Sequence, residues 1–168
     1  MGDHYEYLAV YVDDILIASR NPKAILDTLM SDPINFKLKG NGPVEFHLGC
    51  NYFRDDDGTL CMAPIKYIDR MVDSYKTLFG EAPKQTVRSP LERGDHPELD
   101  DSPLLDQQGI SKYQSLIGTL QLTISLGRFD IATAVMTMSS FRVAPRVGHL
   151  DRLKRVCGYL AKFKHACI

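Results

Sequence analysis

Two adjacent carboxylates, Asp13 and Asp14, are the residues of this chain best suited to chemistry. They separate two apolar runs, residues 8–12 and 15–18. An unpaired carboxylate is costly to remove from water, so a cation is its expected partner in such a segment. Mg²⁺ prefers hard oxygen ligands and commonly takes one or two protein carboxylates together with substrate phosphates. The pair therefore predicts a site for Mg²⁺ or Mn²⁺, binding weakly in this chain alone. The alternative is a surface turn that contains two aspartates.

The flanking residues predict a β-hairpin that would hold this pair. Residues 5–12 and 15–18 are rich in β-branched, aromatic and aliphatic side chains, which favour strands. We expect Asp13 and Asp14 to form the two-residue turn, with both carboxylates at its exposed tip. Because side chains alternate faces along a strand, one carboxylate would point toward the metal and the other partly aside.

The run Tyr11-Val12-Asp13-Asp14 resembles the catalytic palm hairpin of reverse transcriptases. Later blocks are similar, in order, to the copia-type subgroup found in LTR retrotransposons. These blocks are FKLKG (36–40), FHLGC (46–50), KYI (66–68), SPL (89–91), YQSLIGTL (113–120), RFDIA (128–132), HL (149–150) and RVCGYL (155–160). The resemblance covers about residues 7–164 and implies the later half of a polymerase palm, followed by a thumb.

The resemblance implies a role for several residues. Asp13 and Asp14 would be catalytic metal ligands, and Lys39 would assist the pyrophosphate leaving group, although a solvated lysine is the alternative. Tyr11 would contact nucleic acid, and His47, Leu48 and Gly49 would belong to the primer grip, against the alternative of a packed strand with a glycine bulge. The family takes a third carboxylate and the fingers from segments expected before Met1. We therefore expect the chain to be unable to polymerise alone.

A predicted helix over residues 111–125 carries three further candidates. Gln114, Gly118 and Leu122 (or Gln121) fall on one face at helical spacing. A glycine inside a helix costs roughly 1 kcal/mol relative to alanine, so some compensation is expected. In the thumb of the resembled family, such a helix lies along the minor groove of the duplex. Close helix–helix packing is the alternative explanation for the glycine.

Charge is unevenly distributed along the chain. The total is −1, yet the stretch 142–165 holds seven Lys and Arg residues and one acid, Asp151. We expect Arg146, Arg152 and Arg155 to contact phosphates without reading sequence. An ordinary solvated helix face is the alternative. The preceding segment is acidic; its carboxylates are Asp95, Glu98, Asp100, Asp101 and Asp106.

The elements expected to position these residues define an α+β fold. Strands are expected at residues 36–39, 44–53 and 59–62 after the first hairpin. Helices are expected from Pro22 to about residue 31, over 64–78, over 111–125 with a Ser111 cap, over 129–141 and over 147–164. The predicted domains are a partial palm of two hairpins and two helices (1–79), an extended acidic, proline-rich linker that wraps a surface or joins subdomains (80–110), and a three-helix thumb-like bundle (111–168).

Composition limits the other possibilities. With 168 residues, 44% hydrophobic and 24% charged, the chain is long enough for a core. No apolar run approaches the length of a transmembrane helix, and no secretory signal is recognisable, so an intracellular location, cytoplasmic or nuclear, is expected. The four cysteines form no CxxC pair, which disfavours a zinc site.

These observations predict a fragment of an RNA-directed DNA polymerase that binds template–primer duplex nonspecifically. One alternative is a non-catalytic module that binds nucleic acid or a full-length polymerase. A second is another metal-dependent hydrolase, which would need a third carboxylate from Asp55, Asp56, Asp57 or Asp130. The hairpin would present an open sheet edge, so we also expect self-association through that edge.

Overall fold

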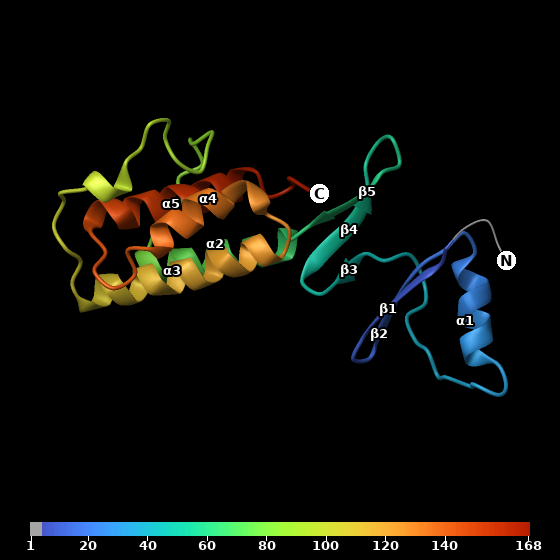
Figure 1. Ribbon diagram of the computed structural model, residues 1–168. Coiled ribbons are helices and arrows are strands. Elements are labelled where there is room, and N and C mark those ends of the chain that lie inside the picture. Colours follow the sequence, from blue (N-terminus) through green and yellow to red (C-terminus); the bar gives the residue numbers. More distant parts are fainter. Residues whose placement is uncertain (1–4) are drawn as a thin grey trace. The chain divides into compact units, whose positions relative to one another are not determined.

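The computed structural model describes residues 5–168, which form two compact units divided between Val44 and Glu45 (Figure 1). Within these described residues, five helices and two small antiparallel sheets confirm the α+β class. A compact unit need not coincide with a functional domain, so the predicted domain boundaries at residues 79 and 110 stay a prediction. No helix within residues 5–168 has the length and apolar character needed to cross a membrane.

The first unit contains a hairpin and one helix. Strands β1 (Tyr7–Tyr11) and β2 (Asp14–Ala18) pair antiparallel, with Tyr7 opposite Ala18 and Tyr11 opposite Asp14. Helix α1 (Pro22–Met30) begins as its sequence predicts, because the Asn21 side chain accepts a hydrogen bond from the Ala24 N–H at 3.3 Å. None of the described residues 5–44 is buried.

The expected strand over residues 36–39 is wrong, because this stretch has no ladder partner in the described part of the chain. Its apolar–polar alternation fits a strand, yet a strand requires a neighbour for its backbone hydrogen bonds. Phe36 N–H instead donates to the Leu29 carbonyl at 2.9 Å, in the loop that follows α1.

The second unit begins with a three-stranded antiparallel sheet in the order β3 (Phe46–His47), β4 (Cys50–Arg54), β5 (Leu60–Ala63). The chain's last residue extends this sheet. Met62 N–H donates to the Ile168 carbonyl at 2.9 Å, and Ile168 N–H returns a bond to Met62 at 3.1 Å.

Four helices follow, with two short 3-10 turns between them. They are α2 (Ile65–Phe79), α3 (Gln107–Ser125), α4 (Ala132–Ser139) and α5 (Val147–Lys162), and the turns are η1 (Pro97–Leu99) and η2 (Phe129–Ile131). Helix α3 starts four residues before the expected Ser111. Its cap is Asp106, whose Oδ1 accepts from the Gly109 N–H at 2.7 Å, so the expected Ser111 cap is wrong.

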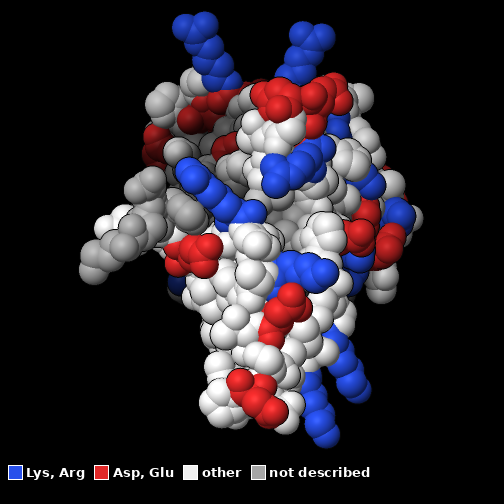
Figure 2. Space-filling model, turned by 90° about the vertical axis from the view of Figure 1, so that its right-hand side faces the viewer, with Lys and Arg blue, Asp and Glu red and all other residues white. Residues whose placement is uncertain are grey.

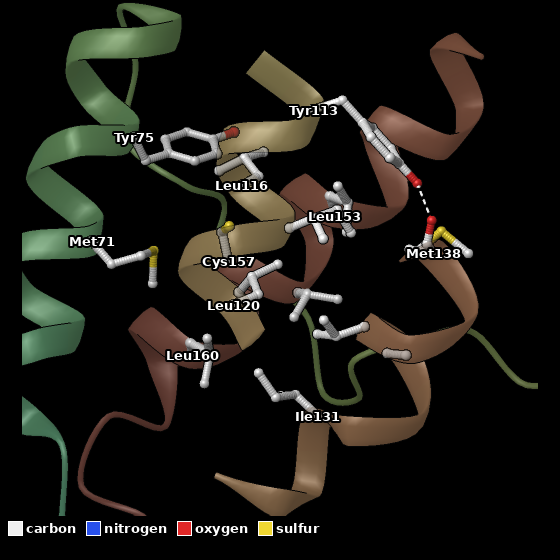
Figure 3. Packing of buried hydrophobic residues seen from close by; sticks show 14 of the residues in the cluster. Met71, Tyr75, Tyr113, Leu116, Leu120, Ile131, Met138, Leu153, Cys157 and Leu160 are labelled. Atoms are coloured by element: carbon white, nitrogen blue, oxygen red, sulfur yellow. Dashed lines mark hydrogen bonds between the residues drawn. The ribbon is translucent and has the colours of Figure 1, made fainter. Parts of the chain in front are cut away.

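The core of the second unit lies among these four helices (Figure 3). Met71 and Tyr75 from α2 face Leu116 and Leu120 from α3, with α4 and α5 completing the cluster. The buried Tyr113 hydroxyl donates to the Met138 carbonyl at 2.7 Å, which satisfies its polar group inside the core. Helix α2, placed with the palm in the sequence interpretation, therefore shares one core with the expected three-helix bundle.

The connecting segment, residues 80–106, lies along α5 (green to yellow in Figure 1). Leu105 N–H donates to the Pro145 carbonyl at 2.9 Å, and Val147 N–H donates to the Pro103 carbonyl at 3.0 Å. The backbone carbonyl of Lys84 sits so close to Gly158 that an added Cβ there would lie 2.1 Å from its oxygen. Residues 80–106 therefore lie along the surface of α5.

Candidate functional site

The two aspartates occupy the tip of the first hairpin, one residue out of the expected register. Asp14 is the first residue of β2 and lies opposite Tyr11, so the two turn residues are Val12 and Asp13. The expected Asp13–Asp14 turn is therefore wrong by one position. Both carboxylates are exposed, as is Tyr11 beside them.

Val12 adopts an unusual backbone conformation at this tip. Its φ is 51°, in the left-handed region that a β-branched residue rarely enters, and its side chain is 82% exposed. A positive φ at the first central residue matches the right-handed twist of the two strands. Such a conformation costs of order 1–3 kcal/mol and is found preferentially at functional sites. The strained residue directly precedes the two carboxylates.

The donor set at this tip fits Mg²⁺ or Mn²⁺. Two adjacent carboxylates supply hard oxygen ligands, and such ions commonly complete their coordination with water and substrate phosphates. No group of three or more His, Cys, Asp or Glu residues able to hold a metal exists among residues 5–168. When bound, the ion would neutralise phosphate charge, and Asp13 and Asp14 would hold it.

Three of the four carboxylates considered for the hydrolase alternative, those of Asp55, Asp57 and Asp130, already have partners within the second unit. Asp55 Oδ1 and Asp57 Oδ1 both accept from the Thr59 N–H, at 2.9 and 2.8 Å. Asp130 is bound by the Arg128 guanidinium at 2.9 and 2.7 Å. These carboxylates stabilise a turn and a buried arginine, respectively.

The cysteines do not form a metal site within the described residues. Cys50, Cys61 and Cys157 are buried, whereas Cys167 is exposed. Burial raises the pKa of the Cys157 thiol to about 12, so it stays protonated at neutral pH.

Lys39 lies exposed in the irregular part of the first unit. It follows residues 36–38 and precedes Gly40, which has a positive φ of 71°. Because the strand expected here is absent, no ladder fixes the direction of the Lys39 side chain within the described residues. Its role at a leaving group stays a prediction.

The block Phe46-His47-Leu48-Gly49-Cys50 forms a tight hairpin in the second unit. His47 pairs with Cys50, and the two turn residues Leu48 and Gly49 have positive φ values of 48° and 87°. Two positive φ values in succession are the pattern of a type I′ turn, which favours glycine. The expected continuous strand over residues 44–53 is therefore wrong.

This hairpin tip is anchored to the end of α3. The Cys50 thiol donates to the Leu126 carbonyl at 3.5 Å, and a Cβ on Gly49 would lie 3.3 Å from the Leu126 side chain. Leu48 is half exposed at the tip. The expected primer-grip residues and the expected duplex-contacting helix therefore lie in the same compact unit and contact each other.

Gln114, Gly118 and Leu122 share an exposed face of α3, as their spacing predicts. Nothing lies within 4 Å of the position that a Cβ on Gly118 would occupy. Helix–helix packing is therefore not what this glycine serves among the described residues. Gln114 Nε2 donates to the Arg142 carbonyl at 3.1 Å, and an open groove of about 400 Å³ runs between this face and residues 142–143.

The three α5 arginines expected at phosphates are engaged by the connecting segment. Arg152 binds both oxygens of Asp95, at 2.8 and 2.7 Å, and also binds Asp100. Arg155 pairs with Glu92 at 2.8 Å, and Arg146 donates to the Ser102 carbonyl. Figure 2 views the molecule from the right-hand side of Figure 1, and both basic and acidic side chains are exposed on the face it draws.

Sequence reasoning missed these pairings and gave no separate role to Arg142. The signal available was the opposition of charge between the acidic segment and the basic stretch. That opposition does not say which partners meet. Asp95 and Arg152 are 57 residues apart, a separation beyond the reach of helix or strand periodicity.

Comparison with known proteins identifies the chain's relatives. It is 32% identical over 165 residues to a protein named for transposon Ty5-1 in Saccharomyces cerevisiae, covering 96% of this chain and 51% of that protein. It is 29% identical over 160 residues to the retrovirus-related Pol polyprotein from transposon RE1 of Arabidopsis thaliana, covering 95% and 10%. It is 27% identical over 154 residues to an uncharacterized mitochondrial protein of the same plant, covering 92% and 60%.

These matches define the class: the chain is related to transposon-encoded Pol proteins. Several of these relatives are copia-type retrotransposon sequences, so the resemblance to copia-type retrotransposon sequences is confirmed. The chain spans about half the length of the Ty5-1 protein and a tenth of the RE1 polyprotein. No family model and no solved structure matches it.

Proposed function

We propose that this chain carries two metal-binding carboxylates, Asp13 and Asp14, of a retrotransposon reverse transcriptase and binds template–primer duplex nonspecifically. The observation that carries the proposal is the exposed aspartate pair beside a strained Val12, in a chain related to Pol polyproteins. Phosphoryl transfer depends mainly on positioning and on neutralising charge, for which a carboxylate-held metal is suited.

Each candidate has a distinct part in this function. Asp13 and Asp14 hold the ion, and Lys39 supplies a proton or a positive charge near the leaving group. Tyr11 and the tip residues His47, Leu48 and Gly49 orient the primer strand. Gln114, Gly118 and Leu122 line the helix face along which the duplex lies. With two metal carboxylates rather than three, the chain alone does not polymerise.

The test is fluorescence anisotropy of a labelled RNA–DNA duplex, at two salt concentrations, with and without Mg²⁺. We expect micromolar binding that weakens with salt and strengthens with Mg²⁺. The variants Asp13→Asn and Asp14→Asn should lose the Mg²⁺-dependent part alone. Asp27→Asn, which removes another exposed carboxylate of the first unit, from α1, is the matched control.

Two other results would redirect the proposal. Binding that is identical in the asparagine variants, with and without Mg²⁺, would favour the non-catalytic module. No binding at low salt would contradict duplex binding altogether.

We also propose self-association through the first hairpin. The sheet β1–β2 has two strands, so each presents an unpaired edge among the described residues. Tyr7, Leu8 and Val10 add exposed apolar side chains to β1. Light scattering should show a mass that rises with protein concentration, and a constant monomer mass would contradict the proposal.

A further inference from the structure

The cations of the C-terminal stretch differ in what they already bind. Arg146, Arg152 and Arg155 are held by the connecting segment, as described above. Lys162 donates to the Val87 carbonyl at 3.1 Å, and Lys164 pairs with Asp69 at 2.9 Å. Lys154 lies 3.9 Å from Asp151 and over the Phe79 ring.

Arg142 is different from these six. Its guanidinium makes no hydrogen bond or ion pair with any residue of 5–168, and it is exposed. Its backbone is nevertheless fixed, because its carbonyl accepts a bond from Gln114 on α3. A cation on an anchored backbone, with no internal counter-charge, remains available to an external anion.

The groove beside Arg142 is lined by Gln114, Ile117, Gly118, Gln121 and Val143, and no acid lines it. The two glutamines offer both donors and acceptors. Gly118 keeps the floor open, since no atom occupies the place of its Cβ. A groove with one cation, two amides and an open floor matches the sugar–phosphate backbone of a nucleic acid, where phosphate contacts position the ligand without reading sequence.

We propose that Arg142 is the phosphate-binding cation of the α3 groove, and that the α5 arginines hold the connecting segment instead of the ligand. This inference rests on the proposed duplex binding and departs from the sequence expectation for Arg146, Arg152 and Arg155. Arg152 would have to break its ion pairs with Asp95 and Asp100 before it could bind a phosphate. It would then gain little binding free energy, because it would exchange one anionic partner for another.

The experiment measures the salt dependence of duplex binding by the full chain. Removing one phosphate contact lowers the slope of log K against log salt by about 1. Arg142→Gln should show that loss, with a several-fold weaker affinity at low salt. Arg155→Gln should keep the wild-type slope, and Arg93→Gln, an exposed arginine of the connecting segment, is the charge-matched control.

Stability and competition complete the test. Urea unfolding should show Arg142→Gln as stable as wild type, so that its loss of binding is not a loss of folding. Polyglutamate at equal charge should displace the duplex poorly. Displacement as strong as by unlabelled duplex would indicate an acidic protein partner and would overturn the assignment of a nucleic acid.

The failures are distinguishable. A wild-type chain that does not bind duplex contradicts the proposed function and this inference with it. Wild-type binding with an unchanged slope in Arg142→Gln, or a slope lowered in Arg155→Gln instead, overturns the inference alone.

Discussion

Arg128 shows how one residue of a family-like sequence block stabilises the molecule. It is 2% exposed, binds Asp130 through two nitrogens and donates to the Phe163 carbonyl at 2.9 Å. Burial opposes ionisation of Asp130, but the hydrogen bonds and charge of Arg128 outweigh it and hold the pKa of Asp130 below its usual value. The block RFDIA therefore joins the end of α5 to the α3–α4 connection.

Arg128→Ala should lower the free energy of unfolding by about 3 kcal/mol, because it removes a fully buried side chain together with its hydrogen bonds to Asp130 and to the Phe163 carbonyl. Urea denaturation measures this change. The exposed Arg70 on α2 provides the control, since Arg70→Ala should stay within about 0.5 kcal/mol of wild type. Equal stability of the two variants would contradict the structural role of Arg128.

Asp100 predicts how stability depends on pH. The hydrogen bond from Ser102 lowers its pKa to about 2, aided by Arg152 and opposed by burial. A pKa lower in the folded than in the unfolded chain contributes stability that is fully present above the ordinary value of 3.8 and lost as the pH falls toward 2. The urea concentration at the unfolding midpoint should therefore decrease as the pH is lowered from 4 to 2.

Asp100→Asn should be less stable at neutral pH and should show a smaller decrease over that range. Asp101→Asn, at the exposed neighbouring residue, should keep the wild-type pH profile. An identical profile in Asp100→Asn would contradict the assigned pKa.

At the scale of elements, two helix glycines predict opposite effects. Gly158 lies against the Lys84 carbonyl, so Gly158→Ala should push the connecting segment from α5 and cost about 1–3 kcal/mol. Gly118 faces open space, so Gly118→Ala should raise helix stability by about 0.5–1 kcal/mol. If the duplex approaches α3 there, the same variant should bind it more weakly. A Gly118→Ala variant with unchanged affinity would argue against that approach.

The sequence predicts elements with a strong internal pattern and misses those decided by distant partners. Helix α2 is predicted within two residues because Ile68, Met71 and Tyr75 recur on one buried face. The break in residues 44–53 was missed because a leucine at positive φ gives no turn signal. The aspartate pair is predictable from two adjacent residues, whereas the candidate role of Arg142 depends on which partners the other cations bind in the folded chain.

At the scale of the whole molecule, the two units differ in what stabilises them. No described residue of the first unit is buried, whereas the second has a continuous apolar core. A two-stranded hairpin alone is marginally stable in water. Amides of β1 and β2 should therefore exchange with solvent far faster than those of α3 and α5, measured by hydrogen exchange at low protein concentration. Equal protection in the two units would contradict this difference.

Because the connecting segment, residues 80–106, binds the later helix α5, the second unit folds in a definite order during synthesis. The hydrogen bonds and ion pairs of this segment join residues 40 to 75 positions apart, and the segment always precedes its partners in the chain. Translation therefore delivers Asp95 and Asp100 to solvent before Arg152 exists. Until α5 emerges from the ribosome, the connecting segment is an acidic stretch of nascent chain without its partners. The second unit can complete its fold only after α5 has been synthesised.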